Sequence, residues 1–272
     1  MRENGYYSFS KSYIYFDVDT SGKSGKVNIG LSINNPENSN SHYKYSVQDI
    51  SIEQDYSLFD TTQKDSIQID DIIFIQDEEV IKNIILTNAI QFSSGDLYSE
   101  EEVEKSIASI SDLQVFKFID VDFEQIGDTL PNETLPLHCR IRLSPQPKQE
   151  LSLQLELNNT EADEFYTTET NESYRYFGIA PSVGYSNLNI FKRALQWNVR
   201  LRTSYEISNE WLSSGEGQNL LEIGLNTSFI QPNARFPEKV FKKPLSKFTR
   251  TNTNFAYYYN ITRDFTRSTI SS

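Results

Sequence analysis

The feature that most constrains this chain is a period-two alternation of apolar and polar residues, which recurs in five segments after Gln149. Successive side chains of a β-strand point to opposite faces, so each segment has one apolar face and one polar face. The apolar members are Leu151, Leu153, Leu155, Leu157; Phe177, Ile179, Pro181, Val183, Tyr185; Leu195, Trp197, Val199, Leu201, Tyr205; Leu221, Ile223, Leu225, Phe229; and Phe255, Tyr257, Tyr259, Ile261. The pattern predicts an antiparallel sheet.

The residues on the polar face favour a membrane barrel. They are Asn, Gln, Ser, Gly and Arg, and not the mixture of Lys and Glu of an ordinary solvent-exposed face. Two long polar connections, 159–175 and 208–219, alternate with a short one at 187–190. Long strands that are apolar outside and polar inside, with long and short connections in turn, are typical of transmembrane barrels. A soluble sandwich or a closed lipocalin-like barrel remains the alternative.

The strand count predicts that this barrel is incomplete. Strands of ~9–11 residues leave room for about five or six after Gln149, whereas the smallest membrane barrels have ~8. An open sheet in lipid would leave backbone groups without partners, at several kcal/mol each. Residues 1–7 carry no apolar targeting segment. We therefore expect a fragment that lacks its export signal and most of its barrel.

Residues 43–146 predict a compact α+β domain in the order β-α-α-β-β. The expected elements are a strand at 45–52, an ambiguous apolar segment at 72–75, helices at 79–89 and from the N-cap Ser99, and strands at 116–123 and 137–143. The expected apolar stripes are Val80, Ile84 and Ile85 on the first helix, with Leu86 as a further candidate, and Val103, Ile107, Ile110 and Leu113 on the second. Ahead of this domain, segments 13–19 and 26–33 predict a β-hairpin, which is too small to be stable alone.

Composition argues against several kinds of chemistry. The net charge of −13 disfavours a nucleic-acid binder, which needs clustered Lys and Arg to neutralise phosphates. One Cys and two His cannot build a cysteine-rich metal site. Cys139 follows His138, but adjacent residues of a strand point to opposite faces and cannot form a nucleophile–base pair. We predict no catalytic, cofactor-binding or metal-ligating residues, and no enzyme.

Several motifs together resemble the BamA/TamA outer-membrane protein assembly superfamily. Residues 137–145 (LHCRIRLSP), with Lys148, Gln149 and the strand ending at Glu156, resemble the junction between its POTRA domains and its barrel. Residues 185–194 (YSNLNIFKRA) look like the turn N-x-N-L-F-x-G-A after its second barrel strand, and 263–267 (RDFTR) are similar to a later motif, R-x-(D/E)-(Y/F)-x-R.

Two upstream segments, 4–20 and 95–98 (GDLY), look like the TamL branch, the Bacteroidetes lipoprotein counterpart of TamA. The chain departs from the family pattern in three places. His138 stands where Asp is usual, Arg193 stands where Gly is usual, and residues 161–163 replace a Gly-rich stretch. The change at Arg193 affects the expected geometry of the tight turn.

The resemblance implies three parts: the end of a preceding POTRA domain in 1–36, a POTRA domain in 43–146, and the first barrel strands in 147–272. It implies a protein of the cell outer membrane whose POTRA part lies in the periplasm. Its expected partners are unfolded outer-membrane protein clients, the lipid bilayer and a periplasm-spanning, TamB-like protein. Without cofactors, the barrel would template client insertion.

Two strands become candidate sites for pairing with a client. The first is the predicted edge strand with Phe116, Phe118, Ile119, Val121 and Phe123, where an extended client could add main-chain hydrogen bonds; a neighbour could equally cover that edge. The second is the lateral-gate strand with Leu151, Leu153, Leu155 and Leu157, whose leucines could equally serve only to face lipid. The competing functions are a two-partner-secretion-type polypeptide transporter and a soluble β-rich interaction module.

Overall fold

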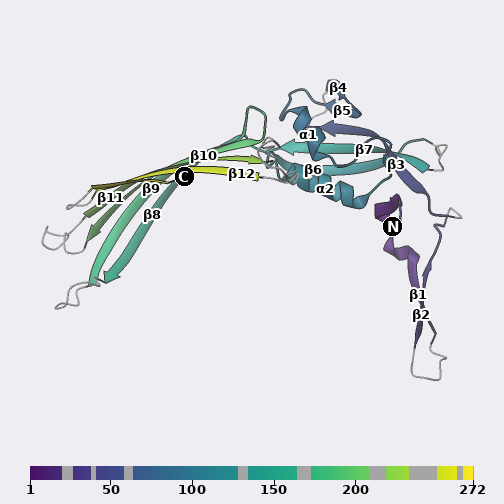
Figure 1. Ribbon diagram of the computed structural model, residues 1–272, viewed down its shortest axis with the longest axis horizontal. Helices are drawn as coiled ribbons and strands as arrows, with labels where there is room; N and C mark the ends of the chain where they lie inside the picture. The colour runs from purple at the N-terminus through teal and green to yellow at the C-terminus, as the bar shows by residue number, and fades with distance from the viewer. Residues whose placement is uncertain are drawn as a thin grey trace, which may run out of the picture. The chain divides into compact units, whose positions relative to one another are not determined.

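The computed structural model describes residues 1–19, 27–37, 41–57, 64–127, 134–163, 173–208, 219–232, 250–261 and 266–271. The fold is mostly β-strand, and it divides into two compact units, Met1–Gln146 and Pro147–Ser272 (Figure 1). Three predicted features lie wholly or partly outside the described residues: the turn at 20–25, the central parts of both long connections, and most of the motif at 263–267.

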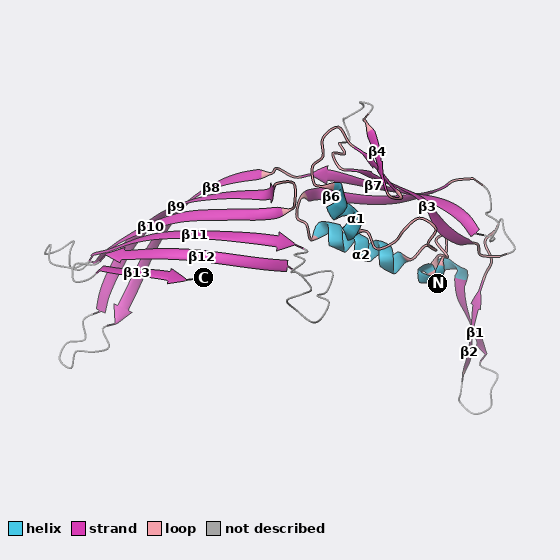
Figure 2. Ribbon diagram, turned by 45° about the horizontal axis from the view of Figure 1, so that its top comes forward, coloured by secondary structure: helices cyan, strands magenta, loops and turns pink. Residues whose placement is uncertain are grey.

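The first unit is built on a five-stranded mixed sheet in the order β4-β5-β3-β7-β6 (Figure 2). In chain order its elements are β3 (Lys44–Glu53), β4 (Ser66–Ile69), β5 (Ile72–Ile75), α1 (Asn83–Ala89), α2 (Glu100–Ser111), β6 (Phe116–Gln125) and β7 (Thr134–Pro145). β3 lies in the centre and runs parallel to β5 and β7, while the outer pairs are antiparallel. The expected order of strands and helices is present. The ambiguous strand expected at 72–75 is β5, and β4, which pairs with it, is an additional strand that was not predicted.

The central strand β3 is buried on both faces, and a bulge interrupts the alternation of its apolar residues. A bulge between Val47 and Asp49 shifts its register against β7. The fully buried side chains around it come from the three inner strands, both helices and the segments beside those helices: Val47, Ile50, Ile52, Phe74, Ile81, Leu86, Ile110, Leu113, Leu137, Ile141 and Leu143. Burying each such side chain contributes roughly 1.5–3 kcal/mol, which makes this core the main source of stability in the first unit.

The first helix differs from its prediction. α1 begins at Asn83 and not near residue 79, and Ile84, expected on its apolar stripe, is 57% exposed. The buried Gln54 explains the orientation: its side-chain amide donates to Asn83 Oδ1 and its oxygen accepts the Ile81 N–H at 2.9 Å. Because this pairing turns Asn83 inward, Leu86 becomes the buried apolar residue of the helix.

The second helix begins as expected. The Ser99 hydroxyl accepts the N–H of Glu102 at 3.5 Å, and three glutamates follow in the first turn, where the helix dipole favours negative charge. Ile110 and Leu113 are fully buried, whereas Val103 and Ile107 are only partly buried. α2 contacts β6 and runs along it (Figure 2).

The N-terminal segment is joined to the first sheet by aromatic rings. It contains two short 3₁₀ turns, Arg2–Asn4 and Lys11–Tyr13, and leads into the hairpin of β1 (Ile14–Asp19) and β2 (Asn28–Ile33). The Tyr7 ring lies 5.6, 5.0 and 5.7 Å from the rings of Tyr45, Tyr98 and Phe123. The main chain of Gly5 also donates to Tyr98 and accepts from Tyr45.

The hairpin β1–β2 repeats the sequence and register of β6–β7. Asp-Val-Asp at 17–19 recurs at 120–122, and Ile-x-Leu-Ser at 29–32 recurs at 141–144. The corresponding cross-strand pairs are Val18–Ile29 with Val121–Ile141, and Phe16–Leu31 with Ile119–Leu143. Ile141 and Leu143 are fully buried, but Ile29 and Leu31 are 66% and 61% exposed. The same apolar face is thus covered in one hairpin and bare in the other.

The second unit is a six-stranded antiparallel meander in the order β13-β12-β11-β10-β9-β8. Its strands are β8 (Gln149–Asp163), β9 (Ser173–Ile190), β10 (Leu195–Ser208), β11 (Asn219–Pro232), β12 (Arg250–Ile261) and β13 (Thr266–Ser271). The alternating segments are therefore strands, as predicted, and the described strands do not close on themselves. Separately, none of the described helices is long and apolar enough to span a bilayer.

Two predicted connections of the second unit are wrong in their boundaries. The short one at 187–190 belongs to β9, and the chain turns instead at 191–194. Phe191, Lys192 and Ala194 have positive φ there, whereas Arg193 does not, so Arg193 puts no strain on the turn. The long connection at 159–175 is shorter than expected, because β8 continues through Asp163 and β9 begins at Ser173.

Replacing Tyr7 with alanine should loosen the N-terminal segment. The three ring contacts would be lost, and we expect the free energy of unfolding of residues 1–146 to fall by about 2 kcal/mol. Urea unfolding followed by circular dichroism would measure this. Tyr15→Ala is the matched control, because Tyr15 is 47% exposed on the hairpin; an equal loss in both variants would contradict the role of the aromatic cluster.

Candidate functional site

The apolar face of the six-stranded sheet is open to its surroundings. One row crosses all six strands through the pairs Leu153–Val183, Val183–Leu201, Leu201–Leu225, Leu225–Tyr257 and Tyr257–Ile270. The members with the greatest exposure are at its two ends, Leu153 at 73% and Ile270 at 80%. An apolar surface that continues over six strands is far more than scattered exposed residues, and marks a face that contacts lipid or protein.

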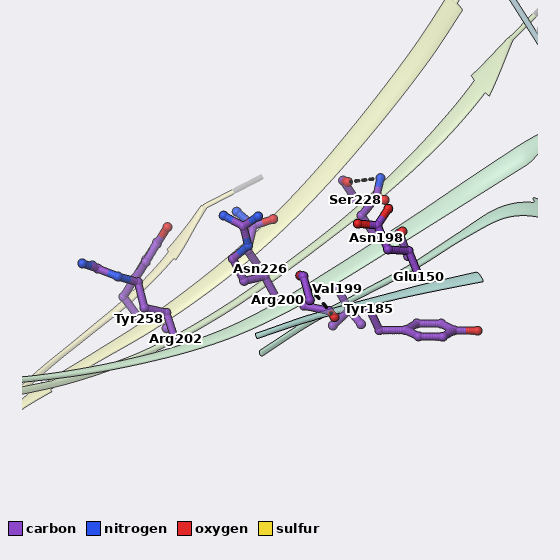
Figure 3. Close-up of a pocket in the computed structure, with 13 residues that line it drawn as sticks. Glu150, Tyr185, Asn198, Val199, Arg200, Arg202, Asn226, Ser228 and Tyr258 are labelled. Atoms are coloured by element: carbon purple, nitrogen blue, oxygen red, sulfur yellow. Dashed lines mark hydrogen bonds between the residues drawn. The ribbon is translucent and has the colours of Figure 1, made fainter. Parts of the chain in front are cut away.

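The opposite face is polar and holds a hollow of about 540 Å³. Arg200, Asn226 and Asn198 project into it from neighbouring strands (Figure 3). Arg202 forms ion pairs with Glu156 at 2.9 Å and with Glu222 at 3.8 Å. This face is suited to water and to polar chain segments, and not to lipid.

Glycines on the polar face make room for side chains from the adjacent strands. A Cβ at Gly184 would lie 2.5 Å from Ser152 Oγ, and one at Gly224 would lie 3.0 Å from the ring of Tyr258. Both neighbours are cross-strand partners in the register. The glycines therefore serve close packing of the polar face.

Each sheet ends in strands that pair on one side only among the described residues. In the second unit these strands are β8 and β13, and in the first unit they are β4 and β6. The outer N–H and C=O groups of such strands can accept an extended chain. These edges are the places where the described fold could pair with another polypeptide.

The predicted gate residues all lie on β8, with their side chains on the apolar face. Leu151, Leu153, Leu155 and Leu157 are 64–73% exposed. Their side chains stand perpendicular to the direction in which a neighbouring strand would add. Pairing by β8 would therefore use its main chain, while these leucines would contact whatever covers the apolar face.

The predicted pairing residues of β6 do not form one surface. Phe116 is buried at 8% exposure, and Phe123 belongs to the aromatic cluster with Tyr7. Ile119 and Val121 are partly buried, on the face of β6 opposite to Phe118. Phe118 alone among the five is open, at 62% exposure, with the Lys117 ammonium 5.2 Å from its ring centre.

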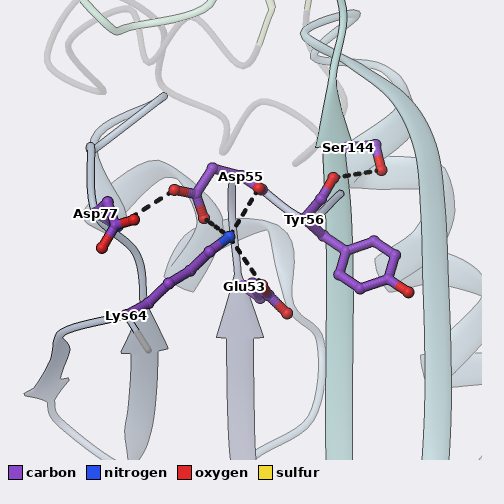
Figure 4. Close-up of polar contacts among 6 residues, drawn as sticks. All are labelled: Glu53, Asp55, Tyr56, Lys64, Asp77 and Ser144. Atoms are coloured by element: carbon purple, nitrogen blue, oxygen red, sulfur yellow. Dashed lines mark hydrogen bonds and ion pairs between the residues drawn. The ribbon is translucent and has the colours of Figure 1, made fainter. Parts of the chain in front are cut away.

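The strongest charge cluster of the first unit surrounds Lys64, which the sequence analysis missed. Its ammonium lies 3.0 Å from Glu53 and 2.8 Å from Asp55, and also donates to the Asp55 carbonyl (Figure 4). Burial lowers the pKa of Lys64, but hydrogen bonds to Asp55 and Glu53 and their charges outweigh it and hold the pKa above its ordinary value. A lysine kept charged in this way fastens the chain before β4 to the end of β3 and is not a base.

Cys139 is fully buried in β7. Burial, with a smaller contribution from the charge of Asp122, raises the pKa of its thiol to about 12. His138 directs its ring to Ser51, with Nε2 3.0 Å from the hydroxyl oxygen. The two residues are thus not paired, and the thiol packs as a small apolar group. Within the described residues, no group of His, Cys, Asp and Glu could hold a metal ion.

Sequence reasoning missed the contacts that link residues far apart in the chain. Glu156 and Arg202 lie 46 positions apart. This contact can be predicted only after the strands are aligned. Both residues then lie on the polar face of the sheet, with a small residue of β9 between them. Lys64 had no comparable signal, because it lies in a polar segment without periodicity.

Comparisons with known proteins find structural similarity only. No family model matches the chain, and no curated protein does. A solved structure of BamA from Haemophilus ducreyi lacking POTRA domains 1–3 has a TM-score of 0.36 at 7% identity, covering 95% of this chain and 50% of that one. CdiB from Acinetobacter baumannii has a TM-score of 0.29 at 10% identity, with coverages of 99% and 44%. The chain thus spans about half the length of these two structures.

The raised pKa predicts an unreactive cysteine. At pH 8 the thiolate fraction of a group with a pKa near 12 is about one in ten thousand, so iodoacetamide should not modify Cys139 in the folded protein. Modification should become complete in urea, where the pKa returns to its ordinary value. Mass spectrometry after timed alkylation measures both states, and rapid labelling of the folded chain would contradict the assignment.

Proposed function

We propose that this chain is part of an outer-membrane protein that inserts or translocates other polypeptides. The observation that carries the proposal is the six-stranded sheet, with an open apolar face, a polar opposite face and an edge strand, β8, that pairs on one side only among the described residues. A soluble sandwich would have to bury this apolar face against a second sheet. In a bilayer the same face contacts lipid tails while the polar face lines an aqueous interior.

The proposal requires further strands. A membrane sheet must close, since lipid offers no partners for the main chain at an edge. We propose that the meander continues into a barrel of the type resembled by residues 137–145 and 185–194. In the whole protein, β8 would then be the first strand beside the seam.

The edge of β8 supports a templating role. A client strand could align against its main chain without any sequence demand, because the hydrogen-bonding groups are those of the backbone. The driving free energy would come from moving client apolar surface into lipid and from satisfying client backbone groups. Such a role needs no cofactor and no catalytic residues, and we propose that the protein is not an enzyme.

We propose that the first unit is the periplasmic part and receives extended clients, as POTRA domains do in the family that the sequence resembles. The β6 edge would add the client as a strand, with Phe118 and Lys117 as its exposed side chains. By its likeness to β6–β7, the hairpin β1–β2 closes a similar module, whose remaining elements would cover the bare face with Ile29 and Leu31. A TamB-like periplasmic partner would deliver lipid or client.

The hollow on the polar face favours a second candidate function, conduction of an unfolded chain as in a two-partner-secretion-type transporter. Its walls carry Arg200 and Arg202 together with Glu150 and Tyr258, a mixture that would interact weakly with many sequences. The two functions differ in the place of the client. An inserted client pairs with β8, whereas a conducted one contacts the polar face.

Placing a charge on the apolar face should prevent stable insertion. We expect Phe255→Arg in the full-length protein to weaken membrane insertion by about 2–4 kcal/mol if it lies near the bilayer centre, and by less near a surface. Carbonate extraction of isolated membranes would measure the fraction retained. The matched control is Asn254→Arg, one residue away on the polar face, and equal extraction of both variants would sink the membrane assignment.

A photo-cross-linking residue at Leu153 should capture a client during assembly. Leu225 is the matched control, because it lies in the same row of the apolar face but has a paired strand on each side. We expect adducts with newly made outer-membrane proteins from position 153 and none from 225.

Depletion of the full-length protein should lower the abundance of barrel proteins in outer-membrane proteomics. Adducts only from polar-face positions would favour the conducting role.

A further inference from the structure

The ladder between β9 and β10 has a gap in its middle. Pairing passes from Ser182–Arg202 to Ile179–Tyr205, and Ala180 and Pro181 fall outside it. Proline has no N–H to donate, so the gap is the expected result when position 181 faces β10. On the other side of β9, pairing with β8 continues through Leu155–Pro181. The pair β8–β9 is therefore tied least firmly to the remaining sheet at Pro181.

Two side-chain contacts cross over β9 on either side of this gap. The Arg202 guanidinium of β10 donates to Glu156 of β8 at 2.9 Å. Nearer the far end of β8, the Asn158 amide donates to Glu206 of β10 at 3.2 Å. Both contacts join strands that are not neighbours. They connect the edge strand directly to β10.

The residues of β9 beneath these contacts are small. Ala180 is the cross-strand partner of Glu156, and Gly178 is the partner of Asn158. A Cβ at Gly178 would lie 1.9 Å from Asn158 Oδ1 and 3.0 Å from the side chain of Glu206. The absence of a side chain at Gly178 is thus what allows these two residues to meet.

Arg202 is also held from the far side. Its partner on β11 is Gly224, which leaves the guanidinium open to Glu222 of the same strand, at 3.8 Å. One arginine therefore links β8, β10 and β11 on the polar face, where no lipid competes. An isolated exposed ion pair contributes little to stability, so it matters only where the main-chain ladder is interrupted.

We propose that Arg202 and Asn158 are positioning residues for the edge strand β8. They hold its far half, from Glu156 onward, in register across the interruption of the ladder at Pro181, so that its outer edge stays straight enough to pair with an incoming strand. The inference rests on the proposed function where it concerns clients, but the mechanical part stands on the sheet alone.

Hydrogen–deuterium exchange of the full-length protein in bilayers tests the mechanical part. In Arg202→Gln, amides of β8 beyond Glu156 and of β9 near Ala180 should exchange about threefold faster, while β11 and β12 stay unchanged. Glu156→Gln should act similarly and leave the contact with Glu222 in place. Asn198→Ala is the matched control, because Asn198 bonds Ser228 on the adjacent strand at 3.3 Å and crosses no strand.

The decisive comparison adds Pro181→Ala. An alanine restores the missing N–H, so the ladder itself should hold β8–β9, and Arg202→Gln should then change exchange by less than half of its effect in the native background. If the two substitutions act independently, or if exchange rises equally in all strands, the proposal is overturned.

Client pairing is read separately with photo-cross-linkers at Leu151 and Leu157, which lie on either side of Glu156. In Arg202→Gln, adducts from Leu157 should spread over several client positions, whereas those from Leu151 should keep one register. No adducts in the unsubstituted protein would remove the proposed function but not the exchange result. Unchanged registers in the variant, with adducts present, would remove the positioning role alone.

Discussion

The main-chain ladder between neighbouring strands is the interaction on which both units depend. In the first unit it fixes β3 at the centre, with β5 and β7 parallel to it, and so decides which residues are buried on both faces. In the second unit the ladder runs through six strands, and residues that are paired across neighbouring strands lie on the same face of the sheet. An open ladder ends in unpaired groups, and whatever pairs with β8 or β6 has to satisfy them. The edges thus follow from the pairing, and they are also the part of the fold that can pair with another chain.

Much of this could be predicted because strand alternation is a local signal. From Leu151 to Leu157 apolar and polar residues alternate, so the sheet face on which each side chain lies can be predicted from its neighbours in sequence. The order of the strands then follows, because consecutive strands of a meander pair with each other. The hairpin β4–β5 was harder to predict from the sequence. Its turn has a positive φ at Asp70, where a glycine or an asparagine would have indicated a turn more clearly. The four apolar residues at 72–75 indicated β5 only as an ambiguous strand, and β4 had no alternation long enough to separate it from a loop.

The remaining errors came from side chains whose partners lie elsewhere in the chain. Periodicity placed Ile84 on the buried stripe of α1, but the buried Gln54 selects Asn83 and rotates the helix. The ends of β8 and β9 run into polar residues because cross-strand pairing, and not hydrophobicity, keeps them extended. Sequence reasoning likewise did not place Phe123 of β6 beside Tyr7, because that contact joins residues far apart in the chain.

The dependence of the sheet on main-chain pairing is clearest at Pro181, where the ladder between β9 and β10 is interrupted. In a central strand a proline is unfavourable, because it removes a donor that the ladder needs. Here it directly follows Ala180 and lies three residues after Gly178, two positions where small residues let polar side chains pass over the strand. The polar face is therefore more than a lining for water. It carries contacts that support the sheet where the main chain cannot pair, and these contacts end on β8, an edge strand of the described sheet.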